Sequence, residues 1–266
     1  MFKTLIFILL FSTRIIANEN TGARAFALKS YVGVANDSWT IFYNPAGLAN
    51  LRNREISFSY IPAKFGLSEL SEKSFAFYEP SLPVKIGFGF KIFGFELYKE
   101  NIFKFSIAYG FEIFNFGLNL NYNFVSIKNY GKAGAFSADF GFFSKSLKFA
   151  RFGFVLKNLI SGRIGQAKES LPKEIEFGFA FLPYDNLMIS VSAHKEMNFR
   201  ESLKYGLEYT IADILILRFG LSNYPIQYSG GIGVKFFVFQ LDYGVNNHQS
   251  LGLTHQITLT AKFEGK

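Results

Sequence analysis

Few residues of this 266-residue chain carry side chains suited to acid–base or nucleophilic chemistry. The chain has three His and no Cys. Asp242, His248, Ser250 and His255 lie near one another towards the C-terminus, and an acid, a base and a hydroxyl are the groups of a serine hydrolase. Their spacing does not enforce the geometry in which the acid orients the base beside the nucleophile. A hydrolase is therefore the least supported reading of these residues.

Metal, phosphate and nucleic-acid sites have no matching pattern. No spacing of the three His fits a known metal site, and the Gly-x-Gly pairs at 87–89 and 231–233 do not precede helices. The net charge is +8, from 28 basic and 20 acidic residues, without a basic cluster typical of nucleic-acid binding. This charge would favour binding to anionic lipid or to an acidic partner, or it would only keep the rim of the protein soluble. We expect no enzyme activity, no cofactor, no metal and no nucleic acid.

Candidate binding residues lie in the N-terminal region. A turn is predicted at Asn44, Pro45, Ala46 and Gly47. An Asn side chain hydrogen-bonds nearby backbone groups, and Pro interrupts regular structure. This turn either places Asn44 against a ligand or a neighbouring strand, or is a fixed device in which Asn44 caps backbone groups. Arg24 needs an acidic partner if this region is enclosed. Candidate partners are Glu174, Glu176, Glu208 and Asp242, and Asp37 is expected to meet a wall cation.

Strands are the elements that would position these groups, because hydrophobicity alternates with a period of two. From 114 to 124, Phe, Leu and Tyr alternate with Asn and Gly, and the segments at 85–92, 174–181, 204–211 and 217–222 repeat the pattern. Successive strand residues point to opposite faces, so each segment has one apolar and one polar face. Charges occupy the polar face, as a membrane requires, since a charge facing lipid costs about 2–4 kcal/mol at the midplane. The pattern predicts an all-β fold: a transmembrane antiparallel β-barrel.

Composition supports a barrel. The chain holds 35 Phe, 14 Tyr and 24 Gly. After the first residues, no apolar run approaches the ~18 residues that a transmembrane helix needs. We count about 14 alternating segments after residue 54, the even number expected of a bacterial barrel.

The chain divides into three parts. Residues 1–17 read as a signal peptide, with Lys3 before a short apolar core and Ala17 as the cleavage residue. Residues 18–53 do not alternate and predict small helices and turns. Residues 54–266 form the barrel, in which Ser161 to Ser170 is a loop or gate. A barrel of 14 strands has a backbone radius of ~14 Å, too wide for side chains alone, so 18–53 is expected to plug its lumen as a hatch.

An ordered set of short motifs resembles the PorV/PorQ family, within the broader FadL-like outer-membrane barrels. The motifs run along nearly the whole chain: Gly22 to Leu28, Val32 to Asp37, Tyr43 to Ala49, Lys157-Asn158-Leu159, Leu171-Pro172, Gly206 to Tyr209, Leu217 to Gly220, Gly231 to Gly233, Leu241 to Tyr243 and Leu251 to Ile257. The last motif departs from the family pattern at Thr254 and Gln256.

The resemblance implies a barrel of 14 strands with an N-terminal hatch, in the outer membrane of a Gram-negative type envelope. Some family members serve type IX secretion, whereas FadL-like relatives pass hydrophobic molecules through a lateral wall opening. We therefore predict a non-catalytic carrier or attachment component whose partners are membrane lipid, secreted cargo proteins or secretion-pore components. The alternative is a channel for hydrophobic small molecules, which a continuous apolar path from the loops to a gap in the wall would favour.

Overall fold

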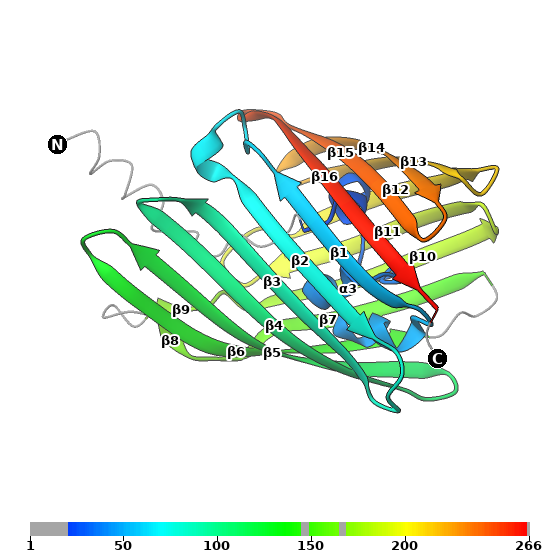
Figure 1. The fold of residues 1–266 in the computed structure, drawn as a ribbon, viewed down its shortest axis with the longest axis horizontal. Helices are drawn as coiled ribbons and strands as arrows, with labels where there is room; N and C mark the ends of the chain where they lie inside the picture. Colours follow the sequence, from blue (N-terminus) through cyan, green and yellow to red (C-terminus); the bar gives the residue numbers. More distant parts are fainter. Residues whose placement is uncertain (1–20, 145–148, 165–168, 265–266) are drawn as a thin grey trace.

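The structure is a computed structural model that describes residues 21–144, 149–164 and 169–264, and in it the chain forms one closed barrel (Figure 1). Strands that follow one another in the wall pair antiparallel, and the first pairs with the last. The wall consists of β1 (Arg54–Ile61), β2 (Glu72–Glu79), β3 (Lys85–Phe95), β4 (Tyr98–Gly110), β5 (Phe114–Ile127), β6 (Gly131–Ser144), β7 (Ala150–Ser161), β10 (Glu174–Tyr184), β11 (Leu187–Glu196), β12 (Ser202–Ile211), β13 (Leu215–Asn223), β14 (Ile226–Phe236), β15 (Phe239–His248) and β16 (Gly252–Phe263).

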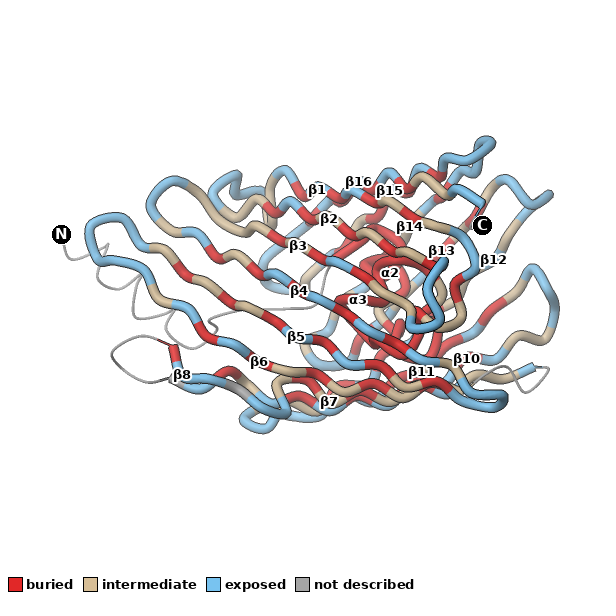
Figure 2. Tube along the Cα trace, turned by 60° about the horizontal axis from the view of Figure 1, so that its bottom comes forward, coloured by how far each residue is buried: buried red, intermediate tan, exposed pale blue. Residues whose placement is uncertain are grey.

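The predicted fold class and strand number are confirmed. Along β5 the exposed fraction of Leu120 is 63%, whereas its neighbours Asn119 and Asn121 are buried. Figure 2 shows the same alternation of buried and exposed residues along most strands. The apolar face therefore points outward and the polar face into the lumen, the arrangement of a barrel surrounded by lipid. None of the helices in the described ranges is long and apolar enough to cross a membrane.

Residues 21–51 lie inside the barrel and confirm the predicted hatch. They form α2 (Ala23–Leu28), α3 (Thr40–Tyr43) and the 3-10 helix η1 (Pro45–Asn50), and nearly all of them are buried (Figure 2). Their apolar side chains pack with Ala76, Tyr78, Ala108, Ala180 and Met188 of the wall. The predicted signal peptide and residues 18–20 lie outside the described residues.

Glycines on the lumenal face of the wall let the hatch backbone approach directly. A Cβ added to Gly178 would lie 2.3 Å from the backbone N of Gly33, and one added to Gly153 would lie 2.0 Å from the carbonyl O of Val32. Gly153 and Gly178 are cross-strand partners, as are three further lumenal pairs that the hatch contacts: Gly117 with Gly141, Gly206 with Gly220 and Gly231 with Gly244. We call these eight residues the glycine seat of the hatch.

The two ends of the barrel differ. Arg54 and Phe263 lie at one end, here called the terminal end. The opposite end, here called the loop end, carries the longest connections, at 62–71 and 162–173. The first contains η2 (Ser68–Leu70), and the second contains the small hairpin of β8 (Arg163–Ile164) and β9 (Glu169–Ser170). In outer-membrane barrels the longer loops face outward and the short turns face the periplasm.

Candidate functional site

The wall is interrupted between β7 and β10 near the loop end. Ile160 of β7 pairs with Ala138 of β6 but Leu156 pairs with Phe140, so three residues, 157–159, stand opposite Asp139 alone. Such a bulge bends its strand and breaks the ladder of hydrogen bonds. Asn158, in its middle, has a φ of 53°, in the left-handed region that Asn tolerates better than most residues.

On the other side of β7, pairing with β10 stops at Lys157 and Glu174. Residues 158–161 of β7 therefore face residues 171–173, which belong to no strand. Among the described residues, one hydrogen bond crosses this interval, from Asn158 Nδ2 to the carbonyl O of Pro172 at 2.7 Å. We call the interval between 158–161 and 171–173 the wall gap. The motifs Lys157-Asn158-Leu159 and Leu171-Pro172, quoted above only for a resemblance, form its two sides.

Apolar side chains line the loop-end side of the wall gap. Ile164 and Leu171 of the 162–173 connection are buried against Ala135 on β6, with Ala133 packed beside them. On the outer surface, Ile160 is 72% exposed and Leu159 is 48% exposed. Two consecutive apolar residues can both be exposed because the bulge breaks the alternation. Within the segment predicted as a loop or gate, Ser161 to Ser170, the described residues form the β8–β9 pair, and Ile164 is buried beside the wall gap.

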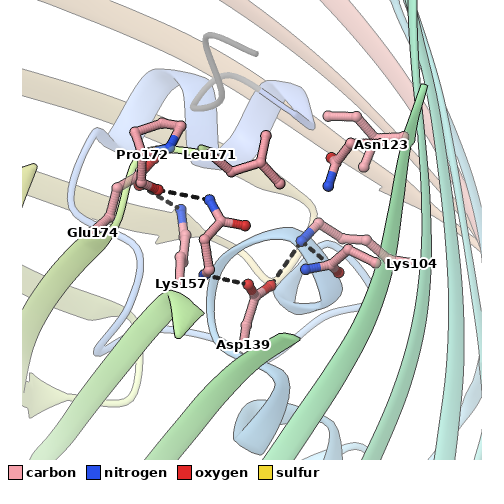
Figure 3. Close-up of a pocket in the computed structure, with 10 residues that line it drawn as sticks. Lys104, Asn123, Asp139, Lys157, Leu171, Pro172 and Glu174 are labelled. Atoms are coloured by element: carbon pink, nitrogen blue, oxygen red, sulfur yellow. Dashed lines mark hydrogen bonds and ion pairs between the residues drawn. The ribbon is translucent and has the colours of Figure 1, made fainter. Parts of the chain in front are cut away.

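A polar pocket lies on the lumenal side of the gap (Figure 3). Its apolar lining is Ile102, Leu171 and Pro172, and its polar lining is Lys104, Asn121, Asn123, Asp139, Lys157, Asn158 and Glu174. The pocket has room for about one water molecule. The pocket is therefore too small for a solute in this form of the protein.

Asp139 connects the bulge, the pocket and the hatch. Its carboxylate accepts hydrogen bonds from the backbone N of Asn158 at 2.9 Å and from Lys104 Nζ at 2.9 Å. It also accepts one from Asn119 Nδ2 at 3.1 Å, and that amide donates to the carbonyl O of Ile41 in the hatch at 2.9 Å. The carboxylate replaces partners that the bulge removes from the ladder, so it holds the bulge in place.

Paired charges line the lumenal wall near the loop end. Lys91 lies 3.0 Å from Glu72, Lys204 lies 3.3 Å from Glu176, and Lys157 lies 3.5 Å from Glu174. All six side chains are buried. A buried charge is tolerated only when it is paired, so these residues fill the lumen as neutral pairs. The described lumenal wall near the loop end is therefore polar, not the continuous apolar path that a permanently open channel for hydrophobic molecules would have.

Arg24 holds the hatch to the wall. Of the four carboxylates predicted as its possible partners, Glu208 is the one that it binds. Its guanidinium donates to both carboxylate oxygens of Glu208, at 2.7 and 2.6 Å. It also contacts Asp37 Oδ2 at 3.1 Å. Arg218 Nε bonds Glu208 at 2.6 Å, so that carboxylate lies between two cations. The expectation that Asp37 meets a wall cation is wrong, because Asp37 bonds Arg24 and the backbone N of Trp39 within the hatch.

Replacing Arg24 by Met should destabilise the docked hatch by about 3–5 kcal/mol, because it leaves buried carboxylates without their cation. Burial alone lowers the pKa of Arg24, but the charges of Glu208 and Asp37 raise it well above its ordinary value, so the cation is present at all working pH values. Trp39 is 2% exposed and is the only Trp, so its fluorescence reports hatch release during denaturant titration.

The matched control is Arg54→Met. The Arg54–Glu79 pair is 2.7 Å long, but the Arg54 side chain is 43% exposed, and such pairs contribute about 0–1 kcal/mol. Equal midpoints of the Trp39 transition in the two variants would contradict the role assigned to Arg24.

The predicted turn at Asn44–Gly47 is present, and its residues are buried. Asn44 Oδ1 accepts from the backbone N of Ala46 at 3.2 Å, and Nδ2 donates to the carbonyl O of Phe142 on β6 at 3.0 Å and of Val32 at 3.3 Å. The side chain thus both caps the turn and joins the hatch to the wall, which combines the two readings left open above. Pro45 begins η1, and Gly47 N bonds the carbonyl O of Asn44 at 3.0 Å.

The hydrolase candidates are not brought together. Asp242 lies in the lumen and bonds Arg218 at 2.6 Å. His255 lies on the outer face, where its Nδ1 is 2.7 Å from the Tyr243 hydroxyl. His248 Nδ1 accepts from the backbone N of Ser250, in the turn beyond β15. Because Asp242 and His255 point to opposite faces of the wall, they cannot act on one substrate.

Known proteins match this chain in fold. No protein-family model and no curated protein matches its sequence. The monoaromatic hydrocarbon channel CymD superposes with a TM-score of 0.69 at 11% identity, over 94% of this chain and 99% of that one. The P. putida toluene transporter TodX gives 0.69 at 10% identity, over 93% and 100%. A Pseudomonas aeruginosa FadL homologue gives 0.60 at 13% identity, over 94% and 98%. The fold is that of FadL-like barrels.

Proposed function

We propose that this protein is a gated channel of the outer membrane for small hydrophobic molecules. In this proposal residues 1–17 direct export, the loop end faces outward, and solutes that enter there leave sideways through the wall gap into the membrane. The proposal corresponds to the alternative function predicted from sequence. The fold shared with hydrocarbon channels supports it, and the wall gap is the single observation that carries it.

The wall gap is a suitable exit because little must be broken to open it. Separating two strands along their paired stretches would break a ladder of backbone hydrogen bonds, whereas in the described part of the chain one hydrogen bond, from Asn158 to Pro172, crosses the gap. A hydrogen bond of this kind contributes about 0.5–1.5 kcal/mol net. Movement of the 162–173 connection would then join the apolar cluster of Ala135, Ile164 and Leu171 to the lipid.

The hatch makes a sideways exit necessary. Residues 21–51 fill the lumen between the pocket and the terminal end, and Arg24 and Asn44 attach them to the wall. A solute in the pocket therefore reaches the membrane through the wall gap more directly than the periplasm through the hatch. We propose that Asn44, Pro45, Ala46, Gly47 and Arg24 serve to keep the hatch seated and do not themselves contact the solute.

Uptake of radiolabelled toluene by Gram-negative cells that produce the barrel tests the proposal. Uptake should exceed that of cells without the barrel, whereas uptake of arabinose should not. Leu171→Asn places a polar amide in the apolar cluster that the solute must pass. Burying the amide costs about 1–3 kcal/mol, so toluene uptake should be about tenfold slower. Leu251→Asn is the control, because Leu251 is 52% exposed in another loop at the same end. Toluene uptake equal to background, or equal in the two variants, would overturn the proposal.

The role in secretion that the PorV/PorQ resemblance implies is the competing proposal. It predicts that the barrel, captured from membranes of its own cells, retains a secreted protein or a component of a secretion pore. Capture that yields lipid alone, together with toluene uptake, supports the channel.

A further inference from the structure

Three lysines lie on the outer face of the wall near the loop end. Lys73, Lys99 and Lys132 are each the second residue of a strand, respectively β2, β4 and β6, and all three strands begin at the loop end. All three side chains are exposed. We call them the lysine row. Ser126 pairs with both Lys99 and Lys132, so its hydroxyl lies between them on the same face.

The lysine row is not neutralised by the protein. None of the three has an ion-pair partner in the described part of the chain, and Lys73 instead lies 5.9 Å from the ring centre of Tyr60. The other basic residues at outward strand positions are paired: Arg54 with Glu79, at the terminal end, and Lys195 with Glu201. An unpaired charge on this face is tolerated only near the membrane interface, where its cost falls to about 0–1 kcal/mol.

The row is confined to one side of the barrel. Within the described residues, the outward positions of β12 to β16 hold no Lys or Arg, and at the loop end they present Leu203, Leu221, Tyr228 and Leu253. A general need for solubility at the rim would not place every unpaired outward cation of the described strands on β2 to β6. The asymmetry therefore points to a specific ligand on that side.

An aromatic surface lies directly below the row, towards the membrane centre. Phe58 and Phe75 pack with ring centres 5.0 Å apart, Phe90 and Phe103 are 4.5 Å apart, and Tyr122 and Phe136 are 4.8 Å apart. Lysines above and aromatic rings below match a molecule with an anionic head and long hydrocarbon tails. Only a membrane component reaches this face of the barrel, so the ligand is a lipid.

We infer that the lysine row and Ser126 bind the phosphate groups of a phosphorylated lipid in the leaflet at the loop end, whose acyl chains lie on the aromatic surface. From Lys73 to Lys132 the row crosses four strand spacings, about 19 Å, which is wide enough for a lipid with more than one phosphate. The inference does not depend on what the channel carries, because it concerns the outer face and not the lumen or the wall gap.

Lipid binding to the full chain, folded in neutral detergent, tests the inference. The two probes are lipid A with its two phosphates and the same lipid after both phosphates have been removed. Each lysine near an anionic lipid surface is worth about fivefold in affinity, so Lys99→Gln/Lys132→Gln should weaken binding of the phosphorylated probe about 25-fold. The dephosphorylated probe should bind wild type more weakly than the phosphorylated probe does. Its affinity should be the same for wild type and for Lys99→Gln/Lys132→Gln.

Two further variants keep the test decisive. Lys173→Gln/Lys195→Gln removes the same charge at the same end but across the barrel, and it should bind like wild type. Lys99→Arg/Lys132→Arg keeps the charge and should retain most of the affinity. Equal binding of both probes by wild type, unchanged binding by the glutamine variant, or complete displacement of the lipid by millimolar inorganic phosphate would overturn the inference.

Discussion

Replacing Gly178 by Val should release the hatch from its seat and turn the closed barrel into a water-filled pore. The backbone N of Gly33 is 2.3 Å from the position of a Cβ at residue 178, a separation that atoms cannot adopt. The wall cannot yield, because Gly178 is paired with Gly153 on one side and Ser192 on the other. The hatch must therefore move, and a barrel of 14 strands without its plug has a lumen with a backbone radius of ~14 Å.

Planar-bilayer conductance and Trp39 fluorescence measure this result together. Wild type should conduct little and show blue-shifted emission that acrylamide quenches poorly, since Trp39 is 2% exposed. Gly178→Val should conduct steadily, with red-shifted and readily quenched emission. Gly230→Val is the control, because the nearest atom to a Cβ there is 3.8 Å away. A valine variant that conducts and fluoresces like wild type would show that the seat does not hold the hatch.

The sequence predicted the barrel and the hatch because both depend on local or summed properties. Alternation is visible within a single strand, and the segments predicted at 85–92, 114–124, 174–181, 204–211 and 217–222 lie within β3, β5, β10, β12 and β13. The hatch followed from size, since 14 strands enclose more space than side chains fill. The Arg24–Glu208 pair followed from the need to neutralise a buried cation, although the sequence did not single out Glu208 among four carboxylates.

The wall gap and the glycine seat could not be predicted in the same way. A bulge is defined by the register of two strands, and the sequence around Asn158 does not show that Asp139 stands opposite it. The lumenal glycines occupy alternate positions in the sequence, and contact with the hatch explains those of the glycine seat. Pairs such as Gly153 with Gly178 carry that information only once the register is known.

Joining the two sides of the wall gap by a disulfide should abolish transport. Asn158 Nδ2 is 2.7 Å from the carbonyl O of Pro172, so residues 158 and 172 face each other across the gap. Loss of free thiols on oxidation verifies that the bridge forms, because a disulfide also requires suitable Cα and Cβ separations. The native chain has no Cys, so oxidation of Asn158→Cys/Pro172→Cys forms only this bridge. A covalent bond replaces a hydrogen bond worth about 1 kcal/mol, and the gap can no longer open. The reduced form of the same variant controls for the substitutions themselves.

Toluene uptake by cells carrying this variant, measured before and after reduction, tests the sideways exit most directly. Cells in which the bridge of this variant is oxidised should take up toluene no faster than cells without the barrel. A reducing agent should restore their uptake. Leu241→Cys/Leu259→Cys bridges two paired residues on β15 and β16, far from the gap, and its uptake should not depend on oxidation. If the oxidised bridge across the wall gap leaves toluene uptake unchanged, solutes do not leave through the gap and the proposed mechanism is wrong.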